Sequence, residues 1–237
     1  MKLKNKIALV TGAGRGIGKA IALTMANEGA SVILTARTLR ELEGVRLTIE
    51  ERGGKARSIV ADLTKDPEVE KIFSQISAEF GRLDILVNNA GIGHFAPVRL
   101  LAAKDFDAMW NLNMRALFLC TQKAIPMMEN QKSGIIVNIS SLGGKNAFVN
   151  GAGYAATKWA LMGFSKCLML EEREYNIRVI TVCPGSVDTS FNPLEGKRGN
   201  SDKILKPQDV ADAVLTAITL PENAMMSEID LRPTNPK

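Results

Sequence analysis

Short runs of aliphatic and β-branched residues alternate with longer amphipathic stretches along the whole chain. Several of the short runs are continuously apolar, which is typical of strands buried on both faces. The expected strands cover residues 7–10, 31–35, 57–60, 84–88, 134–139, 177–182 and 227–231. The expected helices cover residues 17–28, 39–51, 67–79, 103–129, 154–174 and 207–220. This alternation predicts an α/β fold, a Rossmann-type doubly wound parallel sheet of about seven strands with helices on both faces.

The pattern runs through all 237 residues without an internal repeat, a low-complexity tract or a linker. We therefore expect a single domain over residues 1–237. The least regular stretch, residues 190–206, contains Pro193, Gly196 and Gly199. Because proline and glycine interrupt regular structure, we expect a mobile substrate loop there.

Composition narrows the class of protein. A hydrophobic fraction of 46% and a charged fraction of 23% are ordinary for a globular chain. No apolar run approaches the roughly 18 residues needed to cross a bilayer, and the amino terminus lacks the pattern of a secretory signal. The three cysteines are widely spaced, with no CxxC pair, which is typical of reduced thiols. We expect a cytoplasmic protein with no membrane partner.

The net charge of +5 raises the alternative of a nucleic-acid-binding module. The Lys and Arg residues are scattered and form no basic block, so a solvated surface with a few anion ligands is the favoured interpretation. No metal site is expected, because His94 is the only histidine and no Cys/His pair has ligand spacing.

A glycine-rich turn follows the first expected strand, with the sequence Thr11-Gly12-Ala13-Gly14-Arg15-Gly16-Ile17-Gly18. When such a turn joins a strand to the start of a helix, its backbone N–H groups and the positive end of the helix point to the same place. A pyrophosphate is stabilised there. We expect Gly12 to allow the tight turn, Gly16 the close approach of the ligand, and Gly18 the packing of helix on strand. The turn predicts a dinucleotide site.

The end of the second expected strand indicates which dinucleotide binds. An NAD site usually has Asp or Glu there to bind the ribose hydroxyls. This chain instead has Arg37, and Arg15 in the glycine-rich turn adds a second cation. Because a guanidinium suits a phosphate, we expect NADP(H).

Tyr154 and Lys158 are one helical turn apart and share a helix face. A free phenol has a pKa of about 10, which suits proton transfer at neutral pH poorly. A neighbouring ammonium stabilises the phenolate and lowers that pKa. The pair is therefore a candidate acid–base centre, although such a pair taken alone is more often structural.

In this context the chain resembles the single-domain branch of the short-chain dehydrogenase/reductase family over nearly its whole length. The matching segments, in order, are Thr11-Gly12-x-x-x-Gly16-x-Gly18, Asp62-Leu63, Asn88-Asn89-Ala90-Gly91, Asn113, Ser140-Ser141, Tyr154-x-x-x-Lys158 and Pro184-Gly185-x-x-x-Thr189. Together, in this order and spacing, these segments are highly specific.

The resemblance implies a role for each catalytic position. Tyr154 would deliver the proton to the substrate oxygen, and Lys158 would hold the nicotinamide ribose and lower the pKa of Tyr154. Ser141, rather than Ser140, would hydrogen-bond the carbonyl. Asn113 would hold a water in a proton relay from Lys158 to solvent.

The resemblance also implies a cofactor site formed along the chain. Its expected members are Gly12, Gly14, Arg15, Gly16, Ile17, Gly18, Arg37, Asp62, Leu63, Asn89, Ala90, Gly91, Tyr154, Lys158, Pro184, Gly185, Val187 and Thr189. Asp62 and Leu63 would line the adenine site, and residues 184–189 would border the nicotinamide.

The substrate is less defined than the cofactor. The segments 138–141 and 154–158 are similar to those of bacterial 3-oxoacyl-[acyl-carrier-protein] reductases. Those enzymes often have an arginine where Tyr175 lies and a glycine-rich tail where this chain ends in residues 227–237. A general ketone or diketone reductase, or an alcohol dehydrogenase, is as plausible. A sensor that binds NADP(H) without chemistry is the alternative from another class.

Two further expectations concern packing. The long helices that contain Asn113 and Tyr154 resemble those that pair between subunits in this family, so we expect a homodimer or homotetramer. An apolar substrate pocket and ordinary packing are equally compatible with Phe95, Leu142, Phe148 and Phe191. His94 is expected on the surface or in the core rather than at the substrate. Trp159 is expected to point away from the site into packing.

Overall fold

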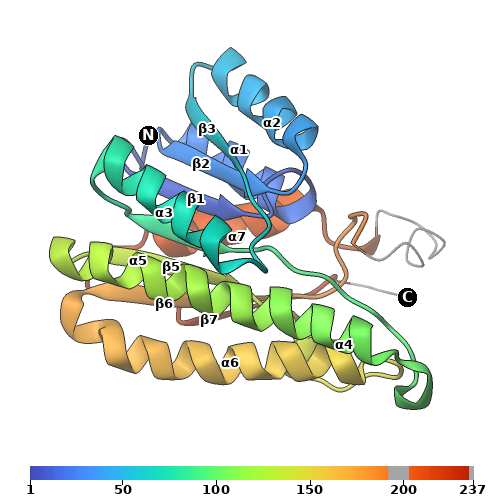
Figure 1. The fold of residues 1–237 in the computed structure, drawn as a ribbon. Helices are drawn as coiled ribbons and strands as arrows, with labels where there is room; N and C mark the ends of the chain where they lie inside the picture. Colours follow the sequence, from blue (N-terminus) through green and yellow to red (C-terminus); the bar gives the residue numbers. More distant parts are fainter. Residues whose placement is uncertain (192–202, 235–237) are drawn as a thin grey trace.

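The computed structural model describes residues 1–191 and 203–234. Its centre is a seven-stranded sheet of strand order β3-β2-β1-β4-β5-β6-β7, in which every neighbouring pair is parallel (Figure 1). The strands are β1 (Ile7–Thr11), β2 (Ser31–Ala36), β3 (Lys55–Val60), β4 (Ile85–Asn88), β5 (Gly134–Ile139), β6 (Ile177–Pro184) and β7 (Glu228–Leu231). The predicted Rossmann-type α/β fold is confirmed.

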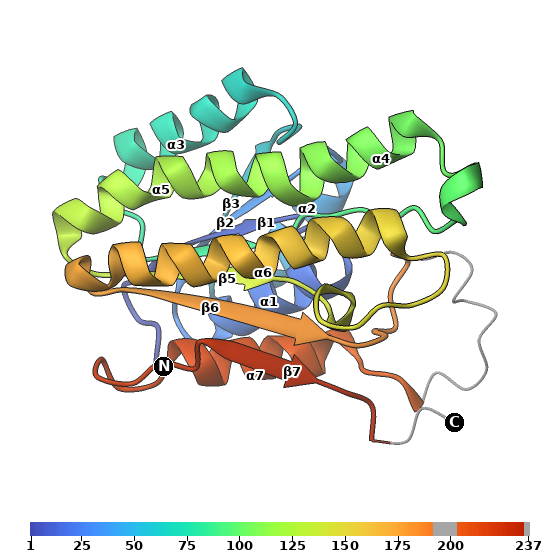
Figure 2. The same ribbon diagram turned by 90° about the horizontal axis from the view of Figure 1, so that it is seen from below.

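Helices cover both faces of the sheet (Figures 1 and 2). One face packs against α1 (Gly16–Asn27), α2 (Leu39–Glu51) and α7 (Pro207–Ile218), and the other against α3 (Asp66–Phe80), α5 (Leu117–Gln131) and α6 (Ala152–Glu172). Successive residues of a strand point to opposite faces, so β1 contributes Ala8 and Val10 to the first layer and Ile7 and Leu9 to the second. Both faces are therefore buried, as the continuous apolar runs predict.

The helix expected over residues 103–129 has an interruption. It consists of α4 (Ala103–Trp110), a π-helical turn (Asn111–Ala116) and α5, which extends to Gln131. A π-helical turn inserts extra backbone into a helix and is frequent at functional sites. Short 3₁₀ turns elsewhere in the described part of the chain include Val98–Leu100, Leu142–Gly144 and Arg173–Tyr175.

The start of α6 determines where Tyr154 lies. The helix begins at Ala152, two positions before the expected start at residue 154. Tyr154 therefore lies in the first turn, and Lys158 follows in the second turn on the same face. The sequence predicts this shared face correctly, whereas the helix starts and ends two positions earlier than expected.

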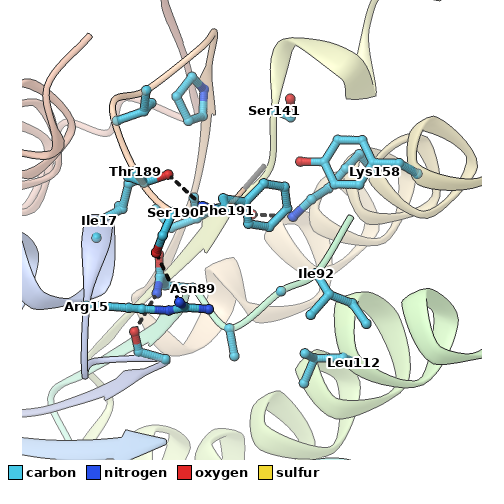
Figure 3. Close-up of a pocket in the computed structure, with 18 of the residues that line it drawn as sticks. Arg15, Ile17, Asn89, Ile92, Leu112, Ser141, Lys158, Thr189, Ser190 and Phe191 are labelled. Carbon is cyan, nitrogen blue, oxygen red and sulfur yellow. Dashed lines mark hydrogen bonds between the residues drawn. The ribbon is translucent and has the colours of Figure 1, made fainter. Parts of the chain in front are cut away.

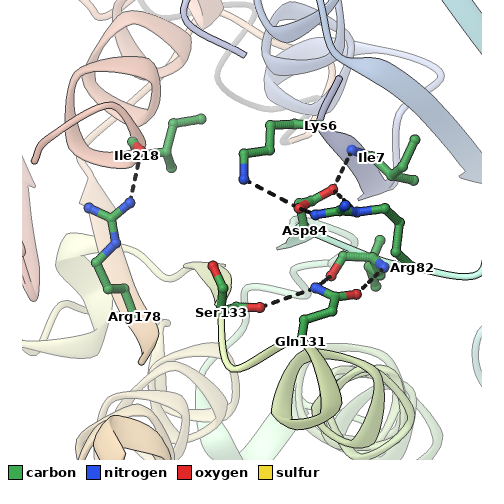
Figure 4. Close-up of polar contacts among 9 residues, drawn as sticks. Lys6, Ile7, Arg82, Asp84, Gln131, Ser133, Arg178 and Ile218 are labelled. Atoms are coloured by element: carbon green, nitrogen blue, oxygen red, sulfur yellow. Dashed lines mark hydrogen bonds and ion pairs between the residues drawn. The ribbon is translucent and has the colours of Figure 1, made fainter. Parts of the chain in front are cut away.

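Two partly buried polar networks tie the elements together (Figure 4). The Asp84 carboxylate accepts hydrogen bonds from the backbone N–H of Ile7 at 2.8 Å and from Arg82 at 2.6 Å. This ion pair raises the pKa of Arg82. Arg178 donates to the carbonyl of Ile218 at 3.1 Å, at the carboxyl end of α7, where helix carbonyls lack internal partners. Asp84 anchors the amino end of β1, opposite the functional edge of the sheet.

The strand order places a crevice at the carboxyl edge of the sheet. From β1 the chain moves outward through β2 to β3, and then returns to β4 on the other side of β1. The loops that follow β1 and β4 therefore leave in opposite directions. In open α/β sheets, ligands bind at this switch point.

The predicted loop over residues 190–206 lies largely outside the described residues, which stop at 191 and resume at 203. Its two flanks are joined, because Val187 pairs with Leu205, and the N–H of Asp188 donates to Leu205 at 2.8 Å. The ammonium of Lys206 lies 3.0 Å from the Asp188 carboxylate. In the part of the chain that the structure describes, no helix combines the length and apolar character needed to span a bilayer.

Candidate active site

A cleft of about 1380 Å³ opens at the carboxyl edge of the sheet (Figure 3). It is bordered by the loops after six of the strands, β1 to β6. Of the positions expected from the sequence, those that line it are Gly12, Gly14, Arg15, Gly16, Ile17, Arg37, Asp62, Leu63, Asn89, Ala90, Gly91, Ser141, Tyr154, Lys158, Pro184, Gly185, Val187 and Thr189. The two remaining positions, Gly18 and Asn113, are buried next to the cleft.

The glycine-rich turn requires glycine for backbone reasons at two positions. Gly12 has φ +64° and Gly16 has φ +55°, in the left-handed region that disfavours side chains. A Cβ atom at Gly12 would lie 3.0 Å from the Cα of Ala90. Gly18 has a different constraint, because a Cβ there would lie 2.3 Å from the carbonyl oxygen of Gly12. The roles expected for Gly12 and Gly18 fit this geometry.

Thr11 and Asn89 join the two loops that border the crevice. The Thr11 hydroxyl donates to the carbonyl of Val87 at 3.1 Å and accepts from the N–H groups of Asn89 and Ala90 at 2.9 and 3.0 Å. The Asn89 side-chain amide donates to the Thr11 carbonyl at 2.9 Å. These bonds fix the spacing between the turn after β1 and the loop after β4.

Two arginines lie at one end of the cleft. Arg15 precedes α1, is exposed and donates a hydrogen bond of 3.0 Å to the hydroxyl of Ser190. Arg37 follows β2 and is also exposed. Burial alone would raise the pKa of Asp62, but hydrogen bonds from Thr64 and the positive charge of Arg37 hold that pKa below its usual range. This end of the cleft therefore contains both cations and the ionised carboxylate of Asp62.

Glu41 is a cleft residue that the sequence analysis missed. It lies in the first turn of α2 and lines the cleft on the side of Arg37. A Cβ at Gly14 would lie 2.9 Å from a carboxylate oxygen of Glu41, so this side chain covers the glycine-rich turn. Its position four residues after Arg37, at the amino end of a helix that starts at the cleft, is the signal that could have found it.

Tyr154, Lys158 and Ser141 meet at the other end (Figure 3). The Lys158 ammonium lies 5.8 Å from the centre of the Tyr154 ring and donates a hydrogen bond of 2.9 Å to the carbonyl of Ile139. Burial lowers the pKa of Lys158 to about 8. The Ser141 hydroxyl accepts a hydrogen bond from the N–H of Gly143 at 3.0 Å, which leaves its own proton available to a ligand.

Asn113 lies in the π-helical turn and connects three parts of the site. Its side chain accepts from the N–H of Ile92 and donates to the carbonyl of Ile92, both at 2.9 Å, and donates to Thr157 at 3.0 Å. A Cβ at Gly91 would lie 3.2 Å from the Asn113 oxygen and 3.9 Å from the Lys158 nitrogen. Asn113 and Lys158 thus approach the same point from two helices.

The apolar residues that the sequence indicated as a possible substrate pocket lie beside Tyr154. Phe95, Leu142, Phe148 and Phe191 all line the cleft, and so does His94. Trp159 lies outside the cleft, as expected, and 53% of its surface is exposed. The expected packing is therefore only partial within this chain. No group of three or more potential metal ligands occurs among the described residues.

A dinucleotide-binding edge next to a Tyr-Lys-Ser centre defines an oxidoreductase site, and comparisons with known proteins agree. A model of the family described as short chain dehydrogenase matches residues 6–198. Sepiapterin reductase of Chlorobaculum tepidum is 34% identical over 238 residues, which cover 97% of this chain and 96% of that protein. The chain belongs to the short-chain dehydrogenase/reductase family.

Solved structures are similar over nearly the full length. A metagenomic short-chain oxidoreductase in complex with NADP has 37% sequence identity and a TM-score of 0.88, covering 99% of each chain. A 7α-hydroxysteroid dehydrogenase in complex with NADH and 7-oxo glycochenodeoxycholic acid has 29% identity and a TM-score of 0.91, covering 98% of this chain and 95% of that one. The chain is accordingly an oxidoreductase acting on alcohol and carbonyl groups.

The residues present fit the NAD(P) cofactor that is typical of this family. The turn at Gly12 and Gly16 leaves its backbone open at the amino end of α1, where N–H groups and the helix dipole favour a pyrophosphate. The buried Lys158 ammonium lies in the same cleft, within reach of a hydroxyl-bearing ligand.

Proposed function

We propose that this chain reduces a ketone with NADPH and catalyses the reverse oxidation of the secondary alcohol with NADP⁺. The observation that supports this most is one continuous cleft that contains Arg15 and Arg37 at one end and Tyr154 with Lys158 at the other. When bound, the reduced nicotinamide supplies a hydride to the carbonyl carbon.

The side chains around the substrate carbonyl have separate roles in proton transfer. Tyr154 donates its hydroxyl proton to the oxygen that becomes the alcohol. Ser141 donates a hydrogen bond to the same oxygen, and the N–H of Gly143, which donates to Ser141, holds the hydroxyl in place. Lys158, with a pKa of about 8, is mainly cationic at neutral pH, and its charge stabilises the tyrosinate left after proton transfer. Asn113 completes the proton relay through a water beside Gly91.

The arginines support NADPH rather than NADH as the reductant. Arg15 and Arg37 are exposed cations at the end of the cleft formed by β1, β2 and α2. A guanidinium offers paired N–H donors to a phosphate, and the exposed side chain is free to adjust to it. The NADP complex of the metagenomic relative is consistent with this choice.

The sequence also suggests a more specific substrate, a 3-oxoacyl thioester carried by an acyl carrier protein. Carrier proteins are acidic, and the reductases that use them often present an arginine near the end of the helix that corresponds to α6. Here that end holds one arginine, Arg173, between the acidic residues Glu171, Glu172 and Glu174, with Glu129 at the end of α5, so that negative charge dominates. Because like charges repel, this surface favours a free small-molecule ketone.

The direct test is a substrate screen with purified protein. Simple ketones, diketones and a 3-oxoacyl thioester are each incubated with NADPH, and oxidation of the nicotinamide is followed by absorbance. We expect turnover of one or more free ketones and no gain from attaching the acyl group to a carrier protein. Tight NADPH binding without turnover of any carbonyl compound would favour the sensor alternative.

We further propose that the protein is a homodimer or homotetramer assembled through α5 and α6. The two helices lie side by side on one side of the molecule (Figure 2). Their exposed large apolar side chains include Phe118 of α5 and Trp159 and Leu170 of α6. Phe118 and Phe164 pack edge to face across the two helices, with ring centres 6.3 Å apart. An exposed apolar patch of this kind is typical of an interface between copies. Light scattering at micromolar protein should give at least the dimer mass, and monomer mass alone would contradict the assembly.

A further inference from the structure

The substrate end of the cleft has an aromatic wall around Tyr154. The ring of Phe95 lies 5.3 Å from that of Tyr154 at 61°, and the ring of Phe191 lies 5.9 Å from it at 62°. Phe148 extends the wall, 6.0 Å from Phe95. These are the edge-to-face and tilted geometries that aromatic rings prefer. We call Phe95, Phe148 and Phe191 the phenylalanine wall.

Three glycines make room for these rings. A Cβ at Gly151 would lie 2.3 Å from Phe148, one at Gly143 would lie 3.0 Å from Phe148, and one at Gly93 would lie 2.7 Å from Phe95. None of the three has a positive φ, so backbone conformation does not require glycine at these places. The missing side chains instead provide the space in which the rings lie beside the reacting tyrosine.

Charge at this end gives no support for an anionic substrate. Among the described residues that line the cleft, the basic ones are Arg15, Arg37, Lys158 and His94. Arg37 lies at the opposite end, Arg15 donates to the hydroxyl of Ser190 next to Phe191, and Lys158 donates to the carbonyl of Ile139. The His94 ring lies 3.9 Å from the carboxylate of Asp105, which would itself repel an anion. Among the described residues of the cleft, a carboxylate or phosphate on the substrate would therefore find no cation beside the Tyr154 ring that lacks another partner.

The mouth of the cleft beside the wall is apolar as well. Val149 lines the cleft and is 88% exposed, and Phe148 next to it is 44% exposed. Exposed aliphatic and aromatic side chains at the rim of a pocket are typical of sites that take apolar ligands. Wall and rim together form a continuous apolar surface that leads to the Tyr154 hydroxyl.

We propose that the substrate is an uncharged aryl ketone whose ring packs against the phenylalanine wall while its carbonyl meets Tyr154 and Ser141. This inference rests on the proposed function and narrows it to a substrate class. Edge-to-face contacts discriminate a planar ring from a saturated ring of similar size, because only the planar ring has the charge distribution that these contacts use. Phe95 and Phe148 are accordingly specificity residues.

The test compares two ketones that differ only in the ring. Acetophenone and 1-cyclohexylethanone are reduced with NADPH by the parent protein and by the variants Phe95→Leu, Phe148→Leu and Phe80→Leu. Leucine keeps the site apolar and removes the aromatic face. Phe80 ends α3 away from the cleft and serves as the matched control. The quantity measured is the ratio of kcat/KM for the two ketones, which cancels effects of a substitution on catalysis in general.

We expect the parent ratio to fall by about 3- to 10-fold in Phe95→Leu and Phe148→Leu, the range for one lost ring contact, and to stay unchanged in Phe80→Leu. Addition of a para-carboxylate to acetophenone should raise KM. An unchanged ratio in both wall variants, with both ketones reduced, would overturn the aryl inference and leave the proposed function intact. Failure to reduce either ketone or any other carbonyl compound would remove both.

Discussion

The ammonium group of Lys158 donates a hydrogen bond of 2.9 Å to the main-chain carbonyl of Ile139, the last residue of β5. This bond fixes the lysine between the sheet and the Tyr154 ring, within the second turn of α6. The cation is almost fully buried, and burial lowers its pKa to about 8. The position that suits the proposed chemistry therefore has a cost in stability, because a buried charge loses its hydration.

This cost can be measured with Lys158→Met, which keeps the length of the side chain and removes the charge. The folded pKa lies below the unfolded value of about 10.4, so the folded state holds fewer protons between these values and its stability rises with pH there. At pH 7 the variant should be more stable than the parent, by on the order of 2–3 kcal/mol. Urea unfolding at pH 7 and pH 9.5 should show this gain shrinking at the higher pH. A gain independent of pH would contradict the buried-cation explanation.

The sequence predicts the layers of this fold well, because its signals are local. The continuous apolar runs at β1, β2 and β4 indicate burial on both faces, and glycines at 12, 16 and 18 indicate the turn. Strand order follows from the right-handed crossovers that such alternation requires. The positions of the candidate catalytic residues at the carboxyl edge then follow from the topology.

Features that depend on contacts between distant segments escaped the sequence analysis. The π-helical turn at Asn113 places its amide against Ile92 and Thr157, which come from two other elements, and no local pattern marks it. Glu41 reaches the cleft only through the packing of α2 against the glycine-rich turn. The exposure of Trp159 likewise depends on which face of α6 lacks a neighbour within the chain.

Tyr154→Phe is the sharpest probe of the catalytic centre. The substitution removes the transferable proton and keeps the ring with its contacts to Phe95 and Phe191. NADPH should still bind, while kcat on the best ketone should fall by about 10²–10⁴-fold, the usual contribution of a general acid. Steady-state kinetics beside a fluorescence titration with NADPH give both quantities. Near-normal turnover in a folded Tyr154→Phe protein would refute the assignment.

Ser141→Ala probes the hydrogen bond to the carbonyl oxygen. It should lower kcat by about 10-fold or more and leave NADPH affinity unchanged, because the hydroxyl faces the substrate end of the cleft. In the double variant with Tyr154→Phe, the combined loss should be smaller than the product of the two single losses, since both groups act on one oxygen. Ser140→Ala is the matched control: the residue borders the cleft, but its hydroxyl oxygen is buried beside Gly144, and its loss should leave kcat within about 3-fold of the parent. Strictly multiplicative losses would indicate that the two groups act independently.

Cofactor preference depends on the charges around Arg37. Arg37→Asp should weaken NADPH binding by about 10-fold or more, corresponding to about 1.5–3 kcal/mol for a charged contact, and should move preference toward NADH. Glu41→Gln should have the opposite sign and tighten NADPH binding by about 3-fold, because it removes an anion from the same end of the cleft. Arg40→Ala, an exposed cation of the same helix turn outside the cleft, is the control. Titrations with both dinucleotides at low salt decide the matter, and equal affinities in the parent would contradict the preference.

Glu172, at the end of α6, is a carboxyl whose pKa is shifted by its surroundings. Burial raises the pKa of this carboxyl, and the negative charges of Glu129, Glu171 and Glu174 raise it further. One of its oxygens, Oε2, receives no hydrogen bond from the described residues. A raised folded pKa means that the folded state favours the protonated form. The contribution of this group to stability is therefore present at low pH and is lost as pH rises through the folded pKa.

Replacing the carboxyl by an amide should relieve this repulsion at neutral pH. Glu172→Gln should raise the free energy of unfolding at pH 7 by about 0.5–1 kcal/mol, which corresponds to a Tm about 1–4 °C higher for a chain of this size. The difference should disappear near pH 4, where the parent is protonated at this site. Glu171→Gln is the matched control, since that neighbour is exposed, and it should gain less. Thermal unfolding of the three proteins at both pH values tests this, and a gain for Glu172→Gln that persists at pH 4 would show that charge is not its cause.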